Sequence, residues 1–149
     1  SSPTTTGDYS GMIEIRDGNS KLCHQVFRRK DFEQVEPRSD LASASEPLQC
    51  SALKLNAGTT FRAHKHITIQ KITTMTQESW CVVQGKVTAH FYDEQGKHLQ
   101  DILLEPGDMS MTFYGGHNYT IEEDNTLVYE YKTGPYMGQE KDKVFLDEL

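Results

Sequence analysis

The chain contains no apolar run that approaches the ~20 residues of a membrane-spanning helix. Its first residues show neither the charged region nor the apolar region of a secretory signal. Cysteines are few, and the three present, Cys23, Cys50 and Cys81, form no Cys-x-x-Cys pair. An odd number of cysteines without such a spacing is typical of a reducing compartment. We therefore expect a soluble, cytoplasmic protein whose cysteines are small buried residues rather than nucleophiles.

Positive charge is also scarce. The 15 lysines and arginines stand against 22 aspartates and glutamates, so the formal net charge is -7. The basic residues are scattered except for the run at 28–30, which we interpret as a solvated face. Binding to nucleic acid or to an anionic membrane depends on clustered Lys and Arg. The composition therefore argues against both as partners.

Short apolar or alternating runs dominate the sequence, and turn residues separate them. The polar residues 1–10 predict a disordered tail. The remainder, 11–149, shows no internal repeat and no linker, which predicts a single domain. Residues 11–27 contain two apolar runs around "DGNS" and predict an N-terminal hairpin. From about 48 to 132 regular turn signals predict an all-β antiparallel sandwich or barrel.

Two histidines stand two residues apart in "TTFRAHKHITIQKI", where polar and apolar residues alternate. Strand side chains alternate between two faces, so this stretch predicts a strand with His64, His66 and Arg62 on one face. The alternation leaves two interpretations open. The histidines are ligands of one metal ion inside a barrel, or they are solvated residues on the outer face of a sheet.

Further residues follow at informative spacings. Six residues separate Glu78 from Gly85, and His117 follows both the turn at 106–108, Pro-Gly-Asp, and a Gly-rich stretch. Together with the His-x-His at 64–66, they resemble the two motifs of the cupin superfamily, small β-barrel proteins that hold a divalent metal ion. The first motif reads Gly, five residues, His-x-His, three or four residues, Glu, six residues, Gly.

The first motif is stretched between His66 and Glu78, where eleven residues, 67–77, replace three or four. A hairpin with its turn near Ile72 would accommodate them, because it places residues 66 and 78 opposite each other. Residues 67–77 then make this hairpin longer than the one in the family pattern.

The sequence departs from the family pattern at one further ligand position and in the second motif. Gln70 stands at the family's spacing and rivals Glu78, but a carboxylate is the harder anionic donor and only Glu78 precedes a Gly by the six-residue gap. In the second motif, Phe113 replaces the inner Pro, the gap from Gly115 to His117 is one residue short, and Ile121 stands where Asn is common.

The resemblance implies a small single-domain cupin: an antiparallel β-barrel or jelly-roll sandwich with an N-terminal hairpin extension. It implies that His64, His66, Glu78 and His117 hold one divalent transition metal ion, Fe, Mn, Ni, Zn or Cu. Four protein ligands leave two adjacent octahedral positions for a chelating substrate.

The implied function is a metal-dependent isomerase, lyase or dioxygenase that acts on a small oxygenated substrate, a sugar derivative or a hydroxy or keto acid. Arg62 would anchor an anionic group, and Tyr119 would assist catalysis. Two alternatives stay open because fold does not fix function: a non-catalytic cupin that binds metal or a small ligand, and a metal-free cupin similar to nucleotide-sugar epimerases with a His and Tyr pair.

Three other features complete the predictions. The segment "LVYEYKTGPYMGQEKDKVF" is similar to the tail of small cupins associated with surface polysaccharides, which favours a carbohydrate substrate. An apolar strip on the outward face of the predicted strand indicates a homodimer. The remaining histidines lack a partner spacing and are interpreted as structural or solvated; they are His24, His90 and His98.

Overall fold

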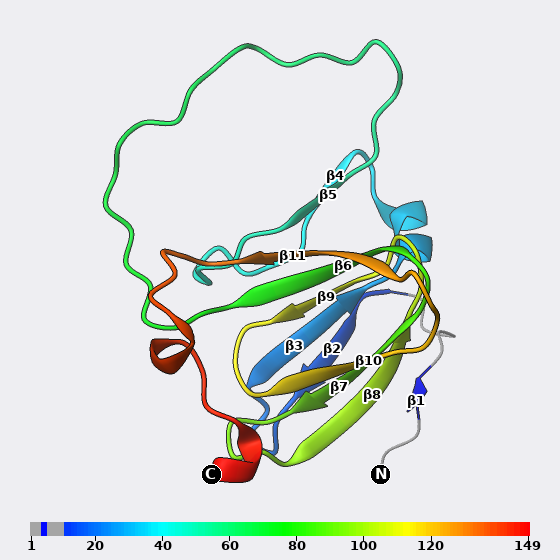
Figure 1. The fold of residues 1–149 in the computed structure, drawn as a ribbon. Helices are drawn as coiled ribbons and strands as arrows, with labels where there is room; N and C mark the ends of the chain where they lie inside the picture. The colour runs from blue at the N-terminus through cyan, green and yellow to red at the C-terminus, as the bar shows by residue number, and fades with distance from the viewer. Residues whose placement is uncertain (1–3, 6–10) are drawn as a thin grey trace.

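Two β-sheets face each other in the computed structural model, which describes residues 4–5 and 11–149 (Figure 1). One sheet has four strands in the order β1 (Thr4–Thr5), β8 (His98–Leu104), β7 (Val87–Tyr92) and β10 (His117–Ile121). The other has five strands in the order β11 (Leu127–Lys132), β6 (Glu78–Gln84), β9 (Met109–Thr112), β3 (Leu22–Phe27) and β2 (Ile13–Arg16). Paired strands are antiparallel except for β1, which runs parallel to β8. The expected all-β class is confirmed, but among the described residues the sheets do not close into a barrel.

The smaller elements lie outside the two sheets. A two-stranded ribbon is formed by β4 (Arg38–Asp40) and β5 (Ser51–Leu53). Three short 3-10 helices are η1 (Arg29–Gln34), η2 (Gln139–Lys141) and η3 (Leu146–Glu148).

The main core lies between the two sheets and is built from residues at alternate strand positions. Val82 of β6, Phe91 of β7 and Ile102 of β8 are fully buried in it. Burying one such side chain contributes about 1.5–3 kcal/mol. The alternation is clearest in β2, where Ile-Glu-Ile-Arg buries only its two isoleucines.

A second apolar cluster covers the opposite face of the five-stranded sheet. Phe27, Met111 and Phe113 pack there against Val35 and Leu48, which precede the ribbon strand β5. Strand β3 is consequently buried on both faces, and five of its six residues are buried. This double coverage places His24 in the protein interior.

The expected N-terminal hairpin is confirmed in β2 and β3, which pair across a turn at residues 17–21. The Asp17 carboxylate closes the turn by accepting the N–H groups of Asn19 and Lys21 at 2.9 Å each. The hairpin differs from the prediction in its position, because both strands belong to the five-stranded sheet rather than extending from it.

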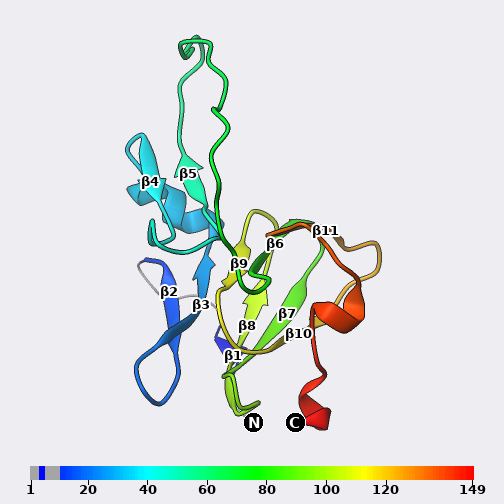
Figure 2. The same ribbon diagram turned by 90° about the vertical axis from the view of Figure 1, so that its left-hand side faces the viewer.

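Residues 54–75, which we call the arm, leave the body after β5 and return just before β6. The arm projects away from both sheets as a long loop (Figures 1 and 2). Every one of its residues is exposed. At its end Gln77 is 1% exposed and holds the chain to the body: its side chain accepts the Leu48 N–H at 2.9 Å and donates to Glu46 at 2.7 Å.

The predicted strand at 59–72 and the hairpin about Ile72 are wrong for this structure, because no residue from 54 to 77 lies in a strand. Alternating polar and apolar side chains favour a strand only where a neighbouring strand satisfies the backbone N–H and C=O groups. The N–H of Lys54, the first residue of the arm, still donates to the Pro37 carbonyl oxygen at 2.7 Å. Beyond it the arm pairs with no strand among the described residues, and all of its side chains are exposed.

The expectation of a disordered tail over residues 1–10 falls outside the described residues, apart from the two of β1. In the part of the chain that the structure describes, no helix has the length and apolar character needed to cross a membrane.

Candidate functional site

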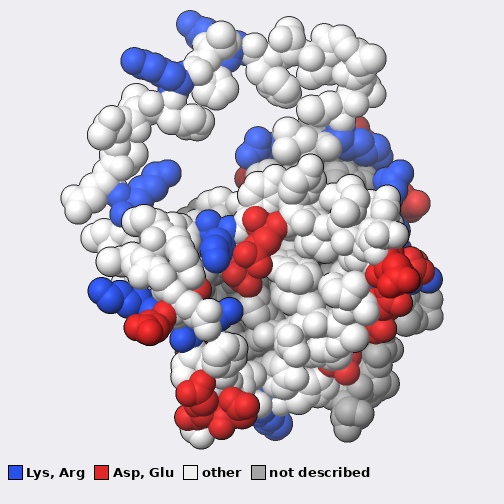
Figure 3. Space-filling view, in the orientation of Figure 1, with Lys and Arg blue, Asp and Glu red and all other residues white. Residues whose placement is uncertain are grey.

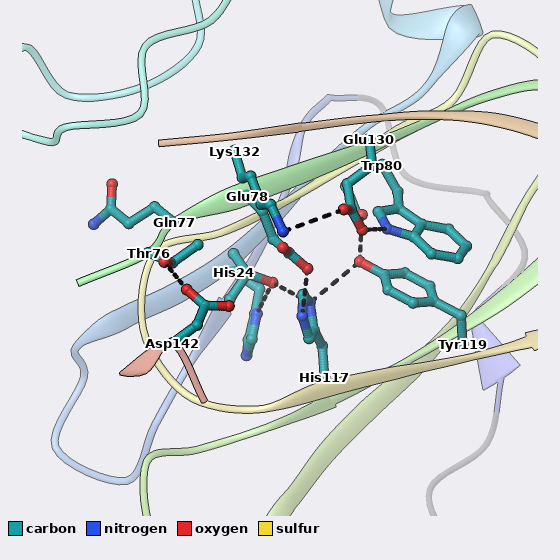
Figure 4. Close-up of polar contacts among 12 residues, drawn as sticks. His24, Thr76, Gln77, Glu78, Trp80, His117, Tyr119, Glu130, Lys132 and Asp142 are labelled. Atoms are coloured by element: carbon teal, nitrogen blue, oxygen red, sulfur yellow. Dashed lines mark hydrogen bonds and ion pairs between the residues drawn. The ribbon is translucent and has the colours of Figure 1, made fainter. Parts of the chain in front are cut away.

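Glu78 and His117 lie side by side between the two sheets. Glu78 is the first residue of β6 and His117 is the first of β10. Their side chains point toward each other, and Oε1 of Glu78 lies 2.8 Å from Nε2 of His117 (Figure 4). The two side chains are only 16% and 22% exposed, respectively. The structure thus brings together two of the four metal ligands that the sequence predicts.

A tight turn before β10 aims His117 inward. Gly115 has a φ of +86°, in the left-handed region that glycine favours. A Cβ atom on Gly115 would lie 2.4 Å from the Tyr92 carbonyl oxygen, so only glycine fits. The next residue, Gly116, exchanges backbone hydrogen bonds with Tyr92 at 2.8 and 3.1 Å. This pairing fixes where His117 begins its strand.

A chain of hydrogen bonds determines which nitrogen of His117 carries a proton. His24 is fully buried, and burial lowers its pKa to about 4, so its ring is neutral at neutral pH. Its Nε2 lies 2.8 Å from the Tyr92 carbonyl oxygen and therefore donates to it. Its Nδ1 must then accept the hydroxyl hydrogen of Thr112, at 2.9 Å. The Thr112 oxygen is left to accept from Nδ1–H of His117, at 3.0 Å.

This arrangement leaves a lone pair on Nε2 of a neutral His117, directed at the carboxylate of Glu78. Two acceptors 2.8 Å apart repel each other unless a cation lies between or beside them. That cation is a proton, which makes an imidazolium and carboxylate pair, or a metal ion bound by both atoms. A histidine that ligates a metal usually donates its other N–H to an outer partner, as His117 does to Thr112.

Tyr119, two residues further along β10, brings a phenol to the same site. Its hydroxyl oxygen lies 3.2 Å from Nδ1 of His117 and 3.3 Å from Oγ of Ser110. Its ring stacks on Trp80 with centroids 3.7 Å apart, and the Trp80 indole N–H donates to Glu130 at 2.8 Å (Figure 4). Burial raises the pKa of Tyr119, so the phenol stays protonated and can donate a hydrogen bond.

The other predicted site residues lie on the arm. His64 and His66 are exposed, with ring centroids 5.6 Å apart, and Nδ1 of His64 donates to the Arg62 carbonyl at 2.9 Å. Gln70 is exposed on the arm as well. Within the described residues, no three His, Cys, Asp or Glu side chains lie close enough together to hold a metal ion.

Sequence reasoning missed His24 and Thr112 as parts of this site. The two residues are directly paired across β3 and β9, a register that no spacing in the sequence reveals. The other two histidines form a separate group: His90 and His98 contact one oxygen of Asp101 at 2.8 and 2.6 Å. Burial of Asp101 opposes its charge, but these contacts outweigh that effect and lower its pKa.

Comparison of the chain with protein-family models, with curated proteins and with solved structures gives no match.

Proposed function

We propose that the protein binds one divalent transition metal ion through Glu78 and His117, and that His64 and His66 complete the ligand set when the arm folds over the site. The protein is then a metal-dependent enzyme of cupin type for a small oxygenated substrate. The observation that carries this proposal is the 2.8 Å contact between Nε2 of His117 and Oε1 of Glu78. The hydrogen bonds through Thr112 imply that this Nε2 carries a lone pair.

The donor atoms present fit such an ion. Ligand atoms at adjacent positions of one ion, each about 2.0–2.2 Å from it, lie about 3 Å apart. The 2.8 Å between Oε1 of Glu78 and Nε2 of His117 is close to that value. Imidazole and carboxylate together suit Fe(II), Mn(II), Ni(II), Zn(II) or Cu(II).

The arm is long enough to bring its histidines to the site. Eleven residues lie between His66 and Glu78, and an extended chain of that length spans roughly 40 Å. Charge favours the movement: residues 54–75 contain four lysines and arginines and no acid, as the basic side chains on the arm in Figure 3 illustrate. All 22 acidic residues lie outside the arm in the sequence. In an extended arm the side chains of His64 and His66 point to the same side, so both can approach one ion.

The chain's own residues suggest the chemistry. A bound ion supplies Lewis acidity toward a carbonyl or hydroxyl oxygen. The protonated Tyr119 phenol, held by stacking on Trp80, donates a proton or hydrogen bond to the substrate beside His117. Arg62 travels with the two histidines and binds a carboxylate or phosphate. Substrates with adjacent oxygens, such as sugar derivatives and hydroxy or keto acids, match these groups.

A second candidate function follows from the same contact. With a proton instead of a metal ion, His117 and Glu78 form a charged acid-base pair, and the Tyr119 hydroxyl lies 3.2 Å from the ring. A His and Tyr pair of this kind abstracts and returns protons next to a carbonyl, as a metal-free epimerase requires. A site that binds metal or a small ligand without turnover is the remaining possibility.

The test is metal content by mass spectrometry on untagged protein purified without chelator, then reconstituted with Fe(II), Mn(II), Ni(II) or Zn(II). We expect about one ion per chain in the wild type and in the control His98→Ala, whose histidine contacts Asp101 and Tyr92. Glu78→Gln and His117→Ala should each abolish binding, and so should the double variant His64→Ala, His66→Ala.

Three outcomes would decide against parts of the proposal. Wild-type protein without metal after reconstitution contradicts metal binding and leaves the acid-base pair. Full binding by the His64→Ala, His66→Ala variant contradicts the role of the arm. Binding without activity on sugars, hydroxy acids or keto acids assigns the non-catalytic alternative.

A further inference from the structure

Three sulfur-bearing side chains lie on the outer face of the five-stranded sheet, away from Glu78 and His117. The Cys50 thiol donates to Sδ of Met109 across 3.7 Å. Cys81 of β6 is directly paired with Met109, the first residue of β9. Side chains opposed in this way have Cβ atoms about 4.5–5.5 Å apart. The sulfur atoms thus come from three separate segments, because Cys50 stands just before β5.

Strand alternation shows that these side chains share one face. Trp80 and Val82 pack into the core between the sheets, so Cys81, which lies between them, points to the other side. Met109 and Cys50 both pack against the second apolar cluster, on that same outer face. The sulfur atoms therefore lie on the opposite side of β6 from Glu78, which shares the parity of Trp80.

The carboxylate that acts on this group is already occupied by backbone donors. Asp108 is the carboxylate whose charge acts on Cys81. Both of its oxygens already accept backbone N–H groups, from Arg29 and from Glu105, at 2.8 Å each. Burial is the main cause that raises the pKa of both thiols, and Cys81 adds to the shift at Cys50, so the two thiols interact. Both are partly exposed, which leaves a path for an ion.

We propose that Cys50, Cys81 and Met109 form a binding site for one Cu(I) ion, which they hold through two thiolates and one thioether. Thiolate and thioether sulfurs are soft ligands that suit Cu(I). A set of three sulfurs that includes a thioether suits it better than Zn(II), whose protein sites are four-coordinate and use Cys, His or carboxylate ligands. Binding forms three Cu–S bonds and releases the two thiol protons, and the copper keeps its oxidation state. The bound ion links Cys50, which precedes the arm, to Cys81 on β6, the strand that follows the arm.

The experiment titrates fully reduced, metal-free protein with Cu(I) under anaerobic conditions, in competition with a chromophoric Cu(I) chelator. We expect one ion per chain and an X-ray absorption spectrum with sulfur neighbours only. Cys50→Ser and Cys81→Ser should each lose more affinity than the 10–100-fold typical of an outer-shell change. Met109→Leu removes the thioether at similar volume and should weaken binding while the fold is kept.

Two controls separate this site from the one proposed above. Cys23→Ser changes the third cysteine, which is fully buried and on which the charges of Asp17, Lys21 and Glu94 act; it should bind Cu(I) as the wild type does. Glu78→Gln should also bind Cu(I) normally, so a failure at either site can be told from a failure at the other. Nitrogen or oxygen neighbours in the X-ray absorption spectrum, or unchanged Cu(I) affinity in folded Cys50→Ser and Met109→Leu, would overturn the proposal.

Discussion

Thr112 links two histidines, and its single hydroxyl hydrogen makes the tautomer of His117 depend on that of His24. Because that hydrogen is donated to His24, the oxygen accepts from Nδ1 of His117. Replacing Thr112 by Val removes the acceptor and frees His117 to adopt the other tautomer, whose Nε2–H faces Glu78. We expect Thr112→Val to lower metal affinity by about 10–100-fold. Chelator competition measures the affinity, and ¹⁵N NMR of the imidazole measures the tautomer.

The matched control for this change is Thr112→Ser, which keeps the hydroxyl. We expect wild-type affinity and the wild-type tautomer from it. An unchanged tautomer in Thr112→Val would show that the hydrogen-bond chain does not control His117.

His24 makes the free energy of unfolding depend on pH. Burial lowers its folded pKa to about 4 from 6.5, although the Tyr92 carbonyl raises it and His117 lowers it further. The unfolded chain therefore binds a proton at a higher pH than the folded protein does. The contribution of His24 to the free energy of unfolding is therefore nearly constant above pH 6.5 and falls between pH 6.5 and 4, by about 2 kcal/mol at pH 5.

Urea unfolding at pH 7 and pH 5 measures this dependence, with His24→Gln as the comparison. Gln keeps hydrogen-bonding groups but does not titrate, so we expect it to lose stability at pH 7 and to show a smaller decrease on acidification. An equal loss of unfolding free energy in the two proteins would mean that the titration of His24 does not cause the pH dependence.

The turn between β9 and β10 is the element that positions His117. Gly115→Ala would place a Cβ atom against the Tyr92 carbonyl in a left-handed backbone, a conformation that costs about 1–3 kcal/mol for residues other than glycine, before any clash. We expect a clearly lower melting temperature and weaker metal binding. The control Gly134→Ala meets no atom closer than 3.8 Å and should melt as the wild type does. Equal melting of both variants would contradict the role given to the turn.

The arm is the element whose accessibility reports ligand binding. Trypsin cleaves after Lys and Arg in exposed chain, and Arg62, Lys65 and Lys71 lie on the exposed arm. We expect these to be the first bonds cut in metal-free protein, as mass spectrometry of the fragments would show. If His64 and His66 fold onto the site, trypsin should cleave these bonds more slowly in protein that has been reconstituted with the metal ion. Cleavage of the arm at the same rate with and without the ion would contradict its closure.

The elements also show what the sequence could predict. The spacing of Glu78 and His117 within the cupin-like motifs predicted that they lie together, and they are 2.8 Å apart although 38 positions separate them. The arm was predicted as a strand from side-chain alternation, which says nothing about whether a partner edge exists. His24 and Thr112 were missed because strand register, rather than residue spacing, makes them neighbours.

At the scale of the whole molecule, an apolar surface lies at one edge of the five-stranded sheet. Strand β11 is the edge strand, and its outward side chains Leu127, Tyr129 and Tyr131 are 52–63% exposed. Val83, on the neighbouring strand β6, is 47% exposed. An edge strand also presents unpaired backbone N–H and C=O groups, which invite pairing with another chain.

We propose that this edge joins two copies of the chain in a homodimer, and we expect a mass of twice 16.9 kDa by light scattering during gel filtration. The variant Tyr129→Glu, Tyr131→Glu should elute as a monomer, because it places charge in the apolar contact. Leu149→Glu is the matched control: Leu149 is 64% exposed, lies outside β11 and should leave the dimer intact. A wild-type mass of one chain at micromolar concentration would refute the dimer, and disruption by the control alone would place the contact elsewhere.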